Sequence, residues 1–108
     1  MRNSFEQKAR RHYRLRGYRI LGTNVWIGGY ELDLVVRRGW QLAFVEVKAK
    51  SGPGLGDPLE MVTEEKQRRL RRTAEAWLDS HPECAGLECR FDVVAIREGR
   101  VECLTEAF

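Results

Sequence analysis

The sequence has no long run of apolar residues. A helix that crosses a membrane needs about 20 consecutive apolar residues, and no segment of this chain approaches that length. The N-terminal stretch from Met1 to Ser4 leads into charged residues and not into the apolar core of a signal peptide. Together these absences predict a cytoplasmic protein.

Cysteine and histidine are also scarce. The three cysteines, Cys84, Cys89 and Cys103, are an odd number and too few for a disulfide framework, which predicts reduced thiols. Together with His81 they could supply four zinc ligands, but their spacing matches no compact zinc-binding motif. Packing is therefore the favoured role of these cysteines.

What is present indicates a single globular domain over residues 1–108. A chain of 108 residues is long enough for a hydrophobic core and too short for two ordinary domains. Hydrophobic residues make up 43% of it and charged residues 32%, a balance that is typical of a folded chain.

Positive charge is concentrated in two stretches, although the net charge is only +3. Seven basic residues and one acid lie between Arg2 and Arg19, and five basic residues without an acid lie between Lys66 and Arg72. Such stretches predict a polyanionic partner, with solvated helix faces as the alternative. The candidate nucleic-acid-binding residues are Arg10, Arg11, Arg14, Lys66, Arg68, Arg69, Arg71 and Arg72.

Apolar periodicity predicts two helices. The first runs from about Ser4, a suitable N-cap, to Arg16, and Gly17 ends it. The second begins at Asp57-Pro58 or at Thr63 and ends near Ser80-His81-Pro82. Its expected buried residues are Leu70, Thr73, Ala74, Trp77 and Leu78, an arrangement that leaves its arginines mainly outward.

Runs rich in β-branched and aromatic residues predict the strands. The expected strands cover residues 18–27 with an interruption near Gly22-Thr23-Asn24, then 31–36, 41–48, 91–96 and 101–104. The second and third of these form an expected antiparallel hairpin. Asp92 is a weaker acid candidate, for which a place at a strand end is the favoured interpretation.

The strand from Phe44 to Lys48 carries the strongest chemical signal. Glu46 and Lys48 are two residues apart, so their side chains leave the same face of a strand. A carboxylate and an ammonium in such an apolar run each need a partner, a metal or a substrate.

The hairpin register decides whether Asp33 joins Glu46. A two-residue turn at Arg38-Gly39, or a four-residue turn from Arg37 to Trp40, would set Asp33 opposite Phe44 and Glu31 opposite Glu46. Asp33 and Glu46 would then be diagonal neighbours that can reach one ion. A three-residue loop would place Asp33 on the opposite face. Carboxylates without histidine or thiol nearby favour Mg²⁺ or Mn²⁺ over zinc. The alternative is an exposed sheet edge with acids and Lys48 paired in solvent.

The order of the motifs resembles the PD-(D/E)XK nuclease superfamily, and in particular the bacterial YraN-like proteins. The matching segments are Gly17-Tyr18-x-Ile20-Leu21, Asn24, Glu31-Leu32-Asp33-Leu34, Phe44-Val45-Glu46-Val47-Lys48, Gly56-x-Pro58, Lys66 to Ala74, and Phe91-Asp92-Val93-Val94. The resemblance implies a restriction-endonuclease-like α/β fold, with a central mixed β-sheet flanked by helices in the order αβββαβ(β).

The same resemblance implies the roles of the site residues. Asp33 and Glu46 would bind Mg²⁺ or Mn²⁺, Lys48 would help to activate water or stabilise charge, and Glu6 would complete the catalytic set. The chain departs from the family at Phe5 and Tyr30, since the family usually has Gly before the helix glutamate and Gly directly before its Glu-x-Asp.

These features predict a magnesium-dependent endonuclease that hydrolyses DNA phosphodiesters, with branched or otherwise structured DNA as the expected substrate. The alternative is a nucleic-acid-binding module on a nuclease fold without catalysis of its own. A third class is an interaction domain that uses Trp26, Trp40 or Trp77 as a contact surface. A homodimer with two-fold symmetry would suit a branched junction.

Overall fold

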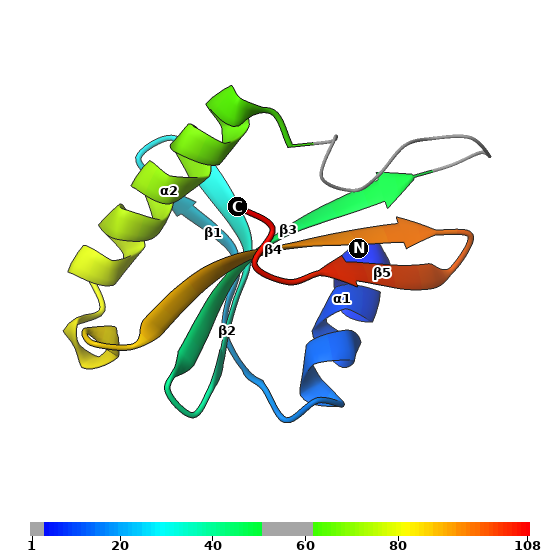
Figure 1. Cartoon of the computed structure of the whole chain (residues 1–108), viewed down its shortest axis with the longest axis horizontal. Helices are drawn as coiled ribbons and strands as arrows, with labels where there is room; N and C mark the ends of the chain where they lie inside the picture. Colours follow the sequence, from blue (N-terminus) through cyan, green and yellow to red (C-terminus); the bar gives the residue numbers. More distant parts are fainter. Residues whose placement is uncertain (1–3, 51–61) are drawn as a thin grey trace.

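The computed structural model describes residues 4–50 and 62–108, and in these residues two α-helices flank a five-stranded sheet (Figure 1). The order of elements confirms the predicted order αβββαβ(β), with a short 3₁₀ helix added. The elements are α1 (Ser4–Arg14), β1 (Arg19–Ile27), β2 (Tyr30–Arg38), β3 (Gln41–Lys50), α2 (Glu64–Asp79), η2 (Pro82–Cys84), β4 (Glu88–Arg97) and β5 (Arg100–Leu104).

The sheet is mixed, as the sequence predicts. Its strand order is β1-β2-β3-β4-β5, and every neighbouring pair is antiparallel except β3 and β4. Parallel strands cannot be joined by a tight turn, and the connection between β3 and β4 contains α2. The region from 51 to 61, which includes the possible helix start at Asp57-Pro58, lies outside the described residues.

The two helices cover opposite faces of the sheet (Figure 1). Tyr13 of α1 packs in one cluster with Val45, and Trp77 of α2 packs in the other with Phe44. Neighbouring residues of β3 are therefore buried on alternate faces, which explains its continuous apolar run. In the part of the chain described, no helix is both long and apolar enough to span a membrane.

Helix α2 begins at the second of its two expected starts. The Thr63 side chain accepts a hydrogen bond from the Lys66 backbone N–H at 3.2 Å, which supplies the N-cap. Of the side chains expected to be buried, Leu70, Thr73, Ala74 and Trp77 are buried and Leu78 is partly buried. The helix ends at Asp79, close to the expected stop.

The hairpin register differs from the expected one by two residues. Val35 pairs with Phe44 and Arg38 pairs with Gln41, so the turn is Gly39-Trp40 and not Arg38-Gly39. The expected pairing of Asp33 with Phe44 is therefore wrong. A shift of two residues preserves the alternation of side chains, and Asp33 stays on the face that carries Glu46. Gly39 has a φ of 59°, a left-handed conformation that glycine adopts without steric cost.

The sheet forks at the point where Asp33 and Glu46 lie. The pairing of β2 with β3 stops at Leu34 and Val45. Beyond that point β2 continues along β1, while β3 continues along β4 as far as Lys50. This opening admits side chains from both helices.

Candidate metal and catalytic site at the sheet fork

Three carboxylates meet at the fork. Glu6 comes from the first turn of α1, and Glu31 and Asp33 come from β2. One oxygen of each lies within 4.8 Å of one oxygen of the others. Among the described residues, this is the only group of three or more potential metal-ligating side chains.

Asp33 is the centre of the group. Its Oδ2 accepts a hydrogen bond from the Val47 backbone N–H at 2.8 Å, so the side chain bridges β2 and β3 where their pairing stops. Asp33 is also in hydrogen-bonding contact with Glu46. Burial and then the Glu46 carboxylate raise the pKa of Asp33 to about 8.

Asn24 connects α1 to the acids, and sequence reasoning missed this role. Its Nδ2 donates to Glu6 Oε1 at 2.7 Å and to Glu31 Oε1 at 3.4 Å. The residue has a φ of 50°, which asparagine tolerates better than most residues. The signal in the sequence was the interruption near Gly22 to Asn24, which marks an irregularity of β1 after Ile20.

Two ammonium groups face Glu46, which is only 8% exposed. Lys66 Nζ of α2 lies 3.5 Å from Glu46 Oε2, and Lys48 follows two residues later on the same strand. Burial and the neighbouring Lys66 lower the pKa of Lys48. The expected Glu46 and Lys48 pair therefore has a second cation, which sequence reasoning had assigned only to nucleic-acid binding.

A cavity of about 220 Å³ opens beside these groups. Its polar walls are contributed by β2, β3 and α2, and the Arg69 guanidinium lies 4.7 Å from the centre of the Tyr30 ring. Thus Tyr30, one of the two departures from the family pattern, holds a basic residue at the edge of the site. The lining residues are Tyr30, Glu31, Asp33, Glu46, Lys66, Arg69, Leu70 and Thr73.

The fork brings together Glu6, Asp33, Glu46 and Lys48, the four residues expected to be catalytic. The closest carboxylate set contains Glu31, however, and not Glu46, which lies between Asp33 and Lys66. Partial burial raises the pKa of Glu31, against a lowering by the hydrogen bond from Asn24. A cation bound at the fork would therefore have four carboxylates near it, those of Glu6, Glu31, Asp33 and Glu46.

The candidate nucleic-acid-binding residues divide between the two faces. Lys66 and Arg69 line the cavity, whereas Arg68, Arg71 and Arg72 are exposed on α2. The Arg71 guanidinium lies 5.3 Å from the centres of the Phe91 and Phe108 rings. Arg10, Arg11 and Arg14 belong to α1, on the other side of the sheet.

Asp92 pairs with Val45 beside the fork, but its side chain contacts Tyr13 on the α1 face of the sheet. It is not at a strand end, so the expected role was wrong. It lies within β4 and is completely buried. Its carboxylate accepts from Tyr13 Oη at 2.7 Å, from Arg90 Nε at 2.9 Å and from the Glu106 backbone N–H at 3.2 Å. A buried carboxylate is stable only with such partners, so Asp92 holds α1 and the C-terminal segment to the sheet.

The chain is similar to bacterial proteins over nearly its whole length. The model of the uncharacterised protein family UPF0102 matches residues 5–96. The UPF0102 protein YraN of Shigella boydii serotype 18 is 38% identical over 107 residues, which cover 98% of this chain and 82% of the relative. A UPF0102 protein of Alkalilimnicola ehrlichii is 39% identical over 106 residues, covering 98% and 84%. A UPF0102 protein of Shewanella amazonensis is 39% identical over 103 residues, covering 95% and 94%. The chain therefore belongs to the uncharacterised protein family UPF0102.

Proposed function

We propose that this protein is a metal-dependent nuclease of the PD-(D/E)XK superfamily that hydrolyses DNA phosphodiesters, with branched or otherwise structured DNA as substrate. The observation that carries the proposal is the group of Glu6, Glu31 and Asp33, whose oxygens lie within 4.8 Å of one another beside Glu46 and Lys48. Uncompensated carboxylates repel one another, and a divalent cation relieves that repulsion.

The donor set favours Mg²⁺ or Mn²⁺. All the candidate ligands are carboxylate oxygens, which are hard donors, and the described cysteines are elsewhere in the fold. Asp33 and Glu46 would hold the ion, with Glu6 or Glu31 adding a further oxygen. When bound, the ion would lower the pKa of a water ligand and neutralise charge on the phosphate.

Other residues would orient the carboxylates, stabilise charge on the phosphate and contact the DNA strand. The Val47 backbone N–H fixes the orientation of Asp33, and Asn24 fixes Glu6. Lys48 contributes positive charge where the phosphate oxygens become more negative. Its lowered pKa makes proton donation to the leaving oxygen easier than for an ordinary lysine. Arg69 and Lys66 lie at the edge of the cavity, where the strand on either side of the reacting phosphate would pass.

The decisive experiment compares the parent with Glu46→Gln on linear, nicked, flapped and four-way DNA, in Mg²⁺ or Mn²⁺ and in EDTA. Cleavage should be abolished by EDTA and should fall by about two orders of magnitude or more in Glu46→Gln, because its uncharged amide binds a cation poorly. DNA binding should persist, since one negative charge that repels phosphate is removed. Glu75→Gln, at an exposed position of α2, is the matched control and should cleave like the parent. Cleavage by Glu46→Gln at the parental rate would remove the fork as the active site.

A second function is favoured by one specific contact. The Lys66 ammonium already neutralises Glu46 at 3.5 Å, an arrangement that suits a nucleic-acid-binding module without catalysis. This alternative predicts DNA binding that is unchanged by EDTA, and no cleavage of any substrate by the parent in either metal. In that case Lys66→Met should leave Glu46 with only one of its two facing cations, Lys48, and lower the melting temperature.

A further inference from the structure

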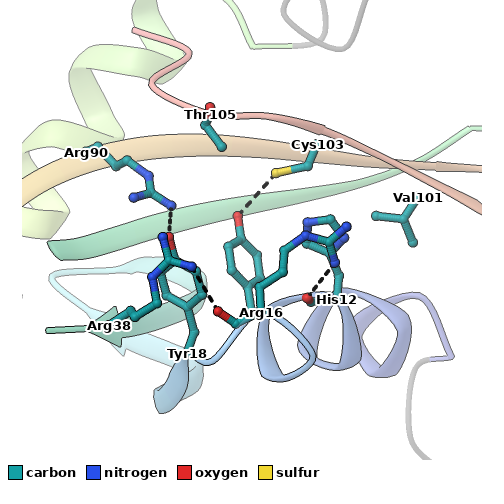
Figure 2. A pocket seen from close by; sticks show the side chains of 9 residues that line it. His12, Arg16, Tyr18, Arg38, Arg90, Val101, Cys103 and Thr105 are labelled. Atoms are coloured by element: carbon teal, nitrogen blue, oxygen red, sulfur yellow. Dashed lines mark hydrogen bonds between the residues drawn. The ribbon is translucent and has the colours of Figure 1, made fainter.

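A second polar cavity lies on the α1 face of the sheet, away from the acids at the fork. It has a volume of about 480 Å³. Glu6 lies in the first turn of α1 and Arg16 beyond its last residue, Arg14, so they are at opposite ends of this helix, about 12 Å of helical rise apart. Figure 2 shows the side chains that line this second cavity, which are His12, Tyr13, Arg16, Tyr18, Arg38, Arg90, Val101, Cys103 and Thr105.

Three arginine side chains line this cavity, and Figure 2 shows the guanidinium groups of Arg38 and Arg90 beside Tyr18 and that of Arg16 beside His12. Arg16 follows α1, Arg38 ends β2 and Arg90 lies in β4. Arg38 Nη1 donates to the Arg16 carbonyl oxygen and Arg16 Nη1 to the His12 carbonyl oxygen, each at 2.9 Å. These bonds fix the side chains without neutralising them. Within residues 4–50 and 62–108, no carboxylate forms an ion pair with Arg16 or Arg38.

The acid that contacts the lining residues Tyr13 and Arg90 is already paired. Asp92 is completely buried and pairs with Arg90 at 2.9 Å. It also accepts hydrogen bonds from Tyr13 and from the Glu106 backbone N–H. Asp92 therefore compensates one guanidinium, and two positive charges remain at the cavity. Burial and then the positive charge of Arg16 lower the pKa of His12, another residue that lines the cavity.

Tyr18 holds two of the cations close together. The Arg38 Cζ lies 4.5 Å from the centre of the Tyr18 ring and the Arg90 Cζ lies 5.4 Å from it. Arg90 Nη2 also donates to the Tyr18 hydroxyl at 2.8 Å. Cation–π attraction offsets part of the repulsion between the two guanidinium groups. Preorganised guanidinium groups of this kind are suited to binding a phosphate through paired N–H donors.

We propose that this cavity binds a phosphate group carried on a larger molecule. Its volume exceeds what inorganic phosphate alone requires and is within the range of small-molecule sites. The phosphate would accept from Arg38, with Arg90 as the wall beside Tyr18, and from Arg16, whose exposed side chain would turn toward it from its place beside His12. Two sources share this chemistry, a free nucleotide and the backbone of a nucleic-acid strand. The proposal stands on its own residues and does not depend on nuclease activity.

The test measures binding of phosphate-bearing probes to the full chain by titration calorimetry. The probes are thymidine 5′-monophosphate against thymidine, and a short oligothymidylate. Arg38→Gln and Arg16→Gln should each weaken binding of a phosphate probe by about tenfold or more, the size expected for losing a hydrogen bond to a charged group. Arg100→Gln changes the same charge at an exposed position of β5 outside the cavity and should bind like the parent.

The two sources give different results. Binding of the mononucleotide that is sensitive to Arg38→Gln identifies a free nucleotide, and sensitivity confined to the oligothymidylate identifies a strand. If no probe binds, or if Arg100→Gln weakens binding as much as Arg38→Gln and Arg16→Gln do, the proposal is wrong. Should Arg38→Gln fail to fold, Arg16→Gln supplies the same comparison, because Arg16 is an exposed residue beyond α1. The measurement follows binding and not cleavage, so failure of the fork chemistry would leave this result unchanged.

Discussion

At the scale of single residues, the environment of a carboxylate decides what it can do. Asp33 and Asp92 are both aspartates on strands, the first partly and the second completely buried, but Asp33 has carboxylate neighbours and Asp92 has Arg90 and Tyr13. The first is therefore poised to exchange its proton for a cation, and the second is a fixed structural anion. Their residue type alone would not distinguish them.

Binding of Mg²⁺ at pH 7 should release nearly one proton per ion. The pKa of Asp33 is raised to about 8 in the metal-free protein, so its carboxyl group is mostly protonated at pH 7 and must lose its proton to become a ligand. Calorimetric titration in two buffers with different ionisation enthalpies measures this proton. The affinity should also tighten as the pH rises from 6 to 8 and then level off. Asp33→Asn should abolish the proton release, and an unchanged release would contradict the assignment.

The raised pKa of Asp33 also determines how the free energy of unfolding of the metal-free protein changes with pH. Between the unfolded pKa of about 4 and the folded pKa of about 8, the folded state binds more protons than the unfolded state. The contribution of Asp33 to the free energy of unfolding is therefore largest below pH 4 and is lost as the pH rises through 8. Denaturant unfolding of the parent and of Asp33→Asn measures this effect. Between pH 4 and 8 the free energy of unfolding should decline less with rising pH in the variant than in the parent.

Asp92→Asn should strongly destabilise the fold. The substitution keeps the size of the side chain but leaves the Arg90 guanidinium without its anion in a largely buried position. Breaking a buried ion pair on one side costs about 3 kcal/mol or more. Denaturant unfolding measures the loss, and Asp79→Asn at the exposed end of α2 should change stability by less than about 0.5 kcal/mol. Equal stability of the two variants would show that the contacts of Asp92 are not important.

At the scale of elements, α2 supplies the crossover between parallel strands and one wall of the site. Its apolar stripe packs on the sheet through Leu70, Ala74 and Trp77, which orients Lys66 and Arg69 toward the fork. The N-cap of the helix is Thr63, and only two residues separate it from Lys66. A change in the cap therefore affects both helix stability and the position of Lys66.

Thr63→Ala should lower the free energy of unfolding by about 1 kcal/mol, because the Lys66 backbone N–H loses its acceptor. Thr63→Ser keeps a hydroxyl acceptor and should stay close to the parent. Thermal and denaturant melts of the three proteins make the comparison. A Thr63→Ala protein as stable as the parent would mean that the cap does not contribute to α2.

At the scale of the whole molecule, the sheet separates two differently charged sites. The acids and two lysines lie at the fork between β2 and β3, and the arginines around Tyr18 lie on the α1 face. Helix α2 contributes Arg69 to the fork cavity and carries three further, exposed arginines, Arg68, Arg71 and Arg72. A nucleic acid that reached the fork would be attracted by these arginines before it contacted the acids.

Binding of duplex DNA should depend steeply on salt, and the exposed arginines of α2 should contribute to the slope. Each phosphate contact contributes about 0.9 to the slope of log affinity against log salt concentration. The double variant Arg68→Gln and Arg72→Gln should reduce the slope by about 1.8 if each residue contacts one phosphate. Arg19→Gln, at an exposed position of β1, is the control. An unchanged slope in the double variant would place the DNA elsewhere.

The local pattern of the sequence determined the elements and the alternation of side chains within them. Helix and strand periods depend on neighbours a few residues apart, so the strands and the shared face of Glu46 and Lys48 followed from the chain itself, and Thr63 was one of two possible helix starts. The shared face of Asp33 and Glu46 required an even shift of register, and the actual shift of two residues met that condition.

Only the tertiary structure decided which groups surround Asp33. The fork between β2 and β3 results from pairing with different partner strands on either side, and it admits Glu6, Asn24 and Lys66 from distant parts of the chain. The same is true of Arg38 and Arg90, which belong to β2 and β4 and lie against Tyr18, and of Arg16, which lines the same cavity from beyond α1. Sequence periodicity carries no information on such meetings, because they depend on sheet register, twist and helix packing over the whole domain.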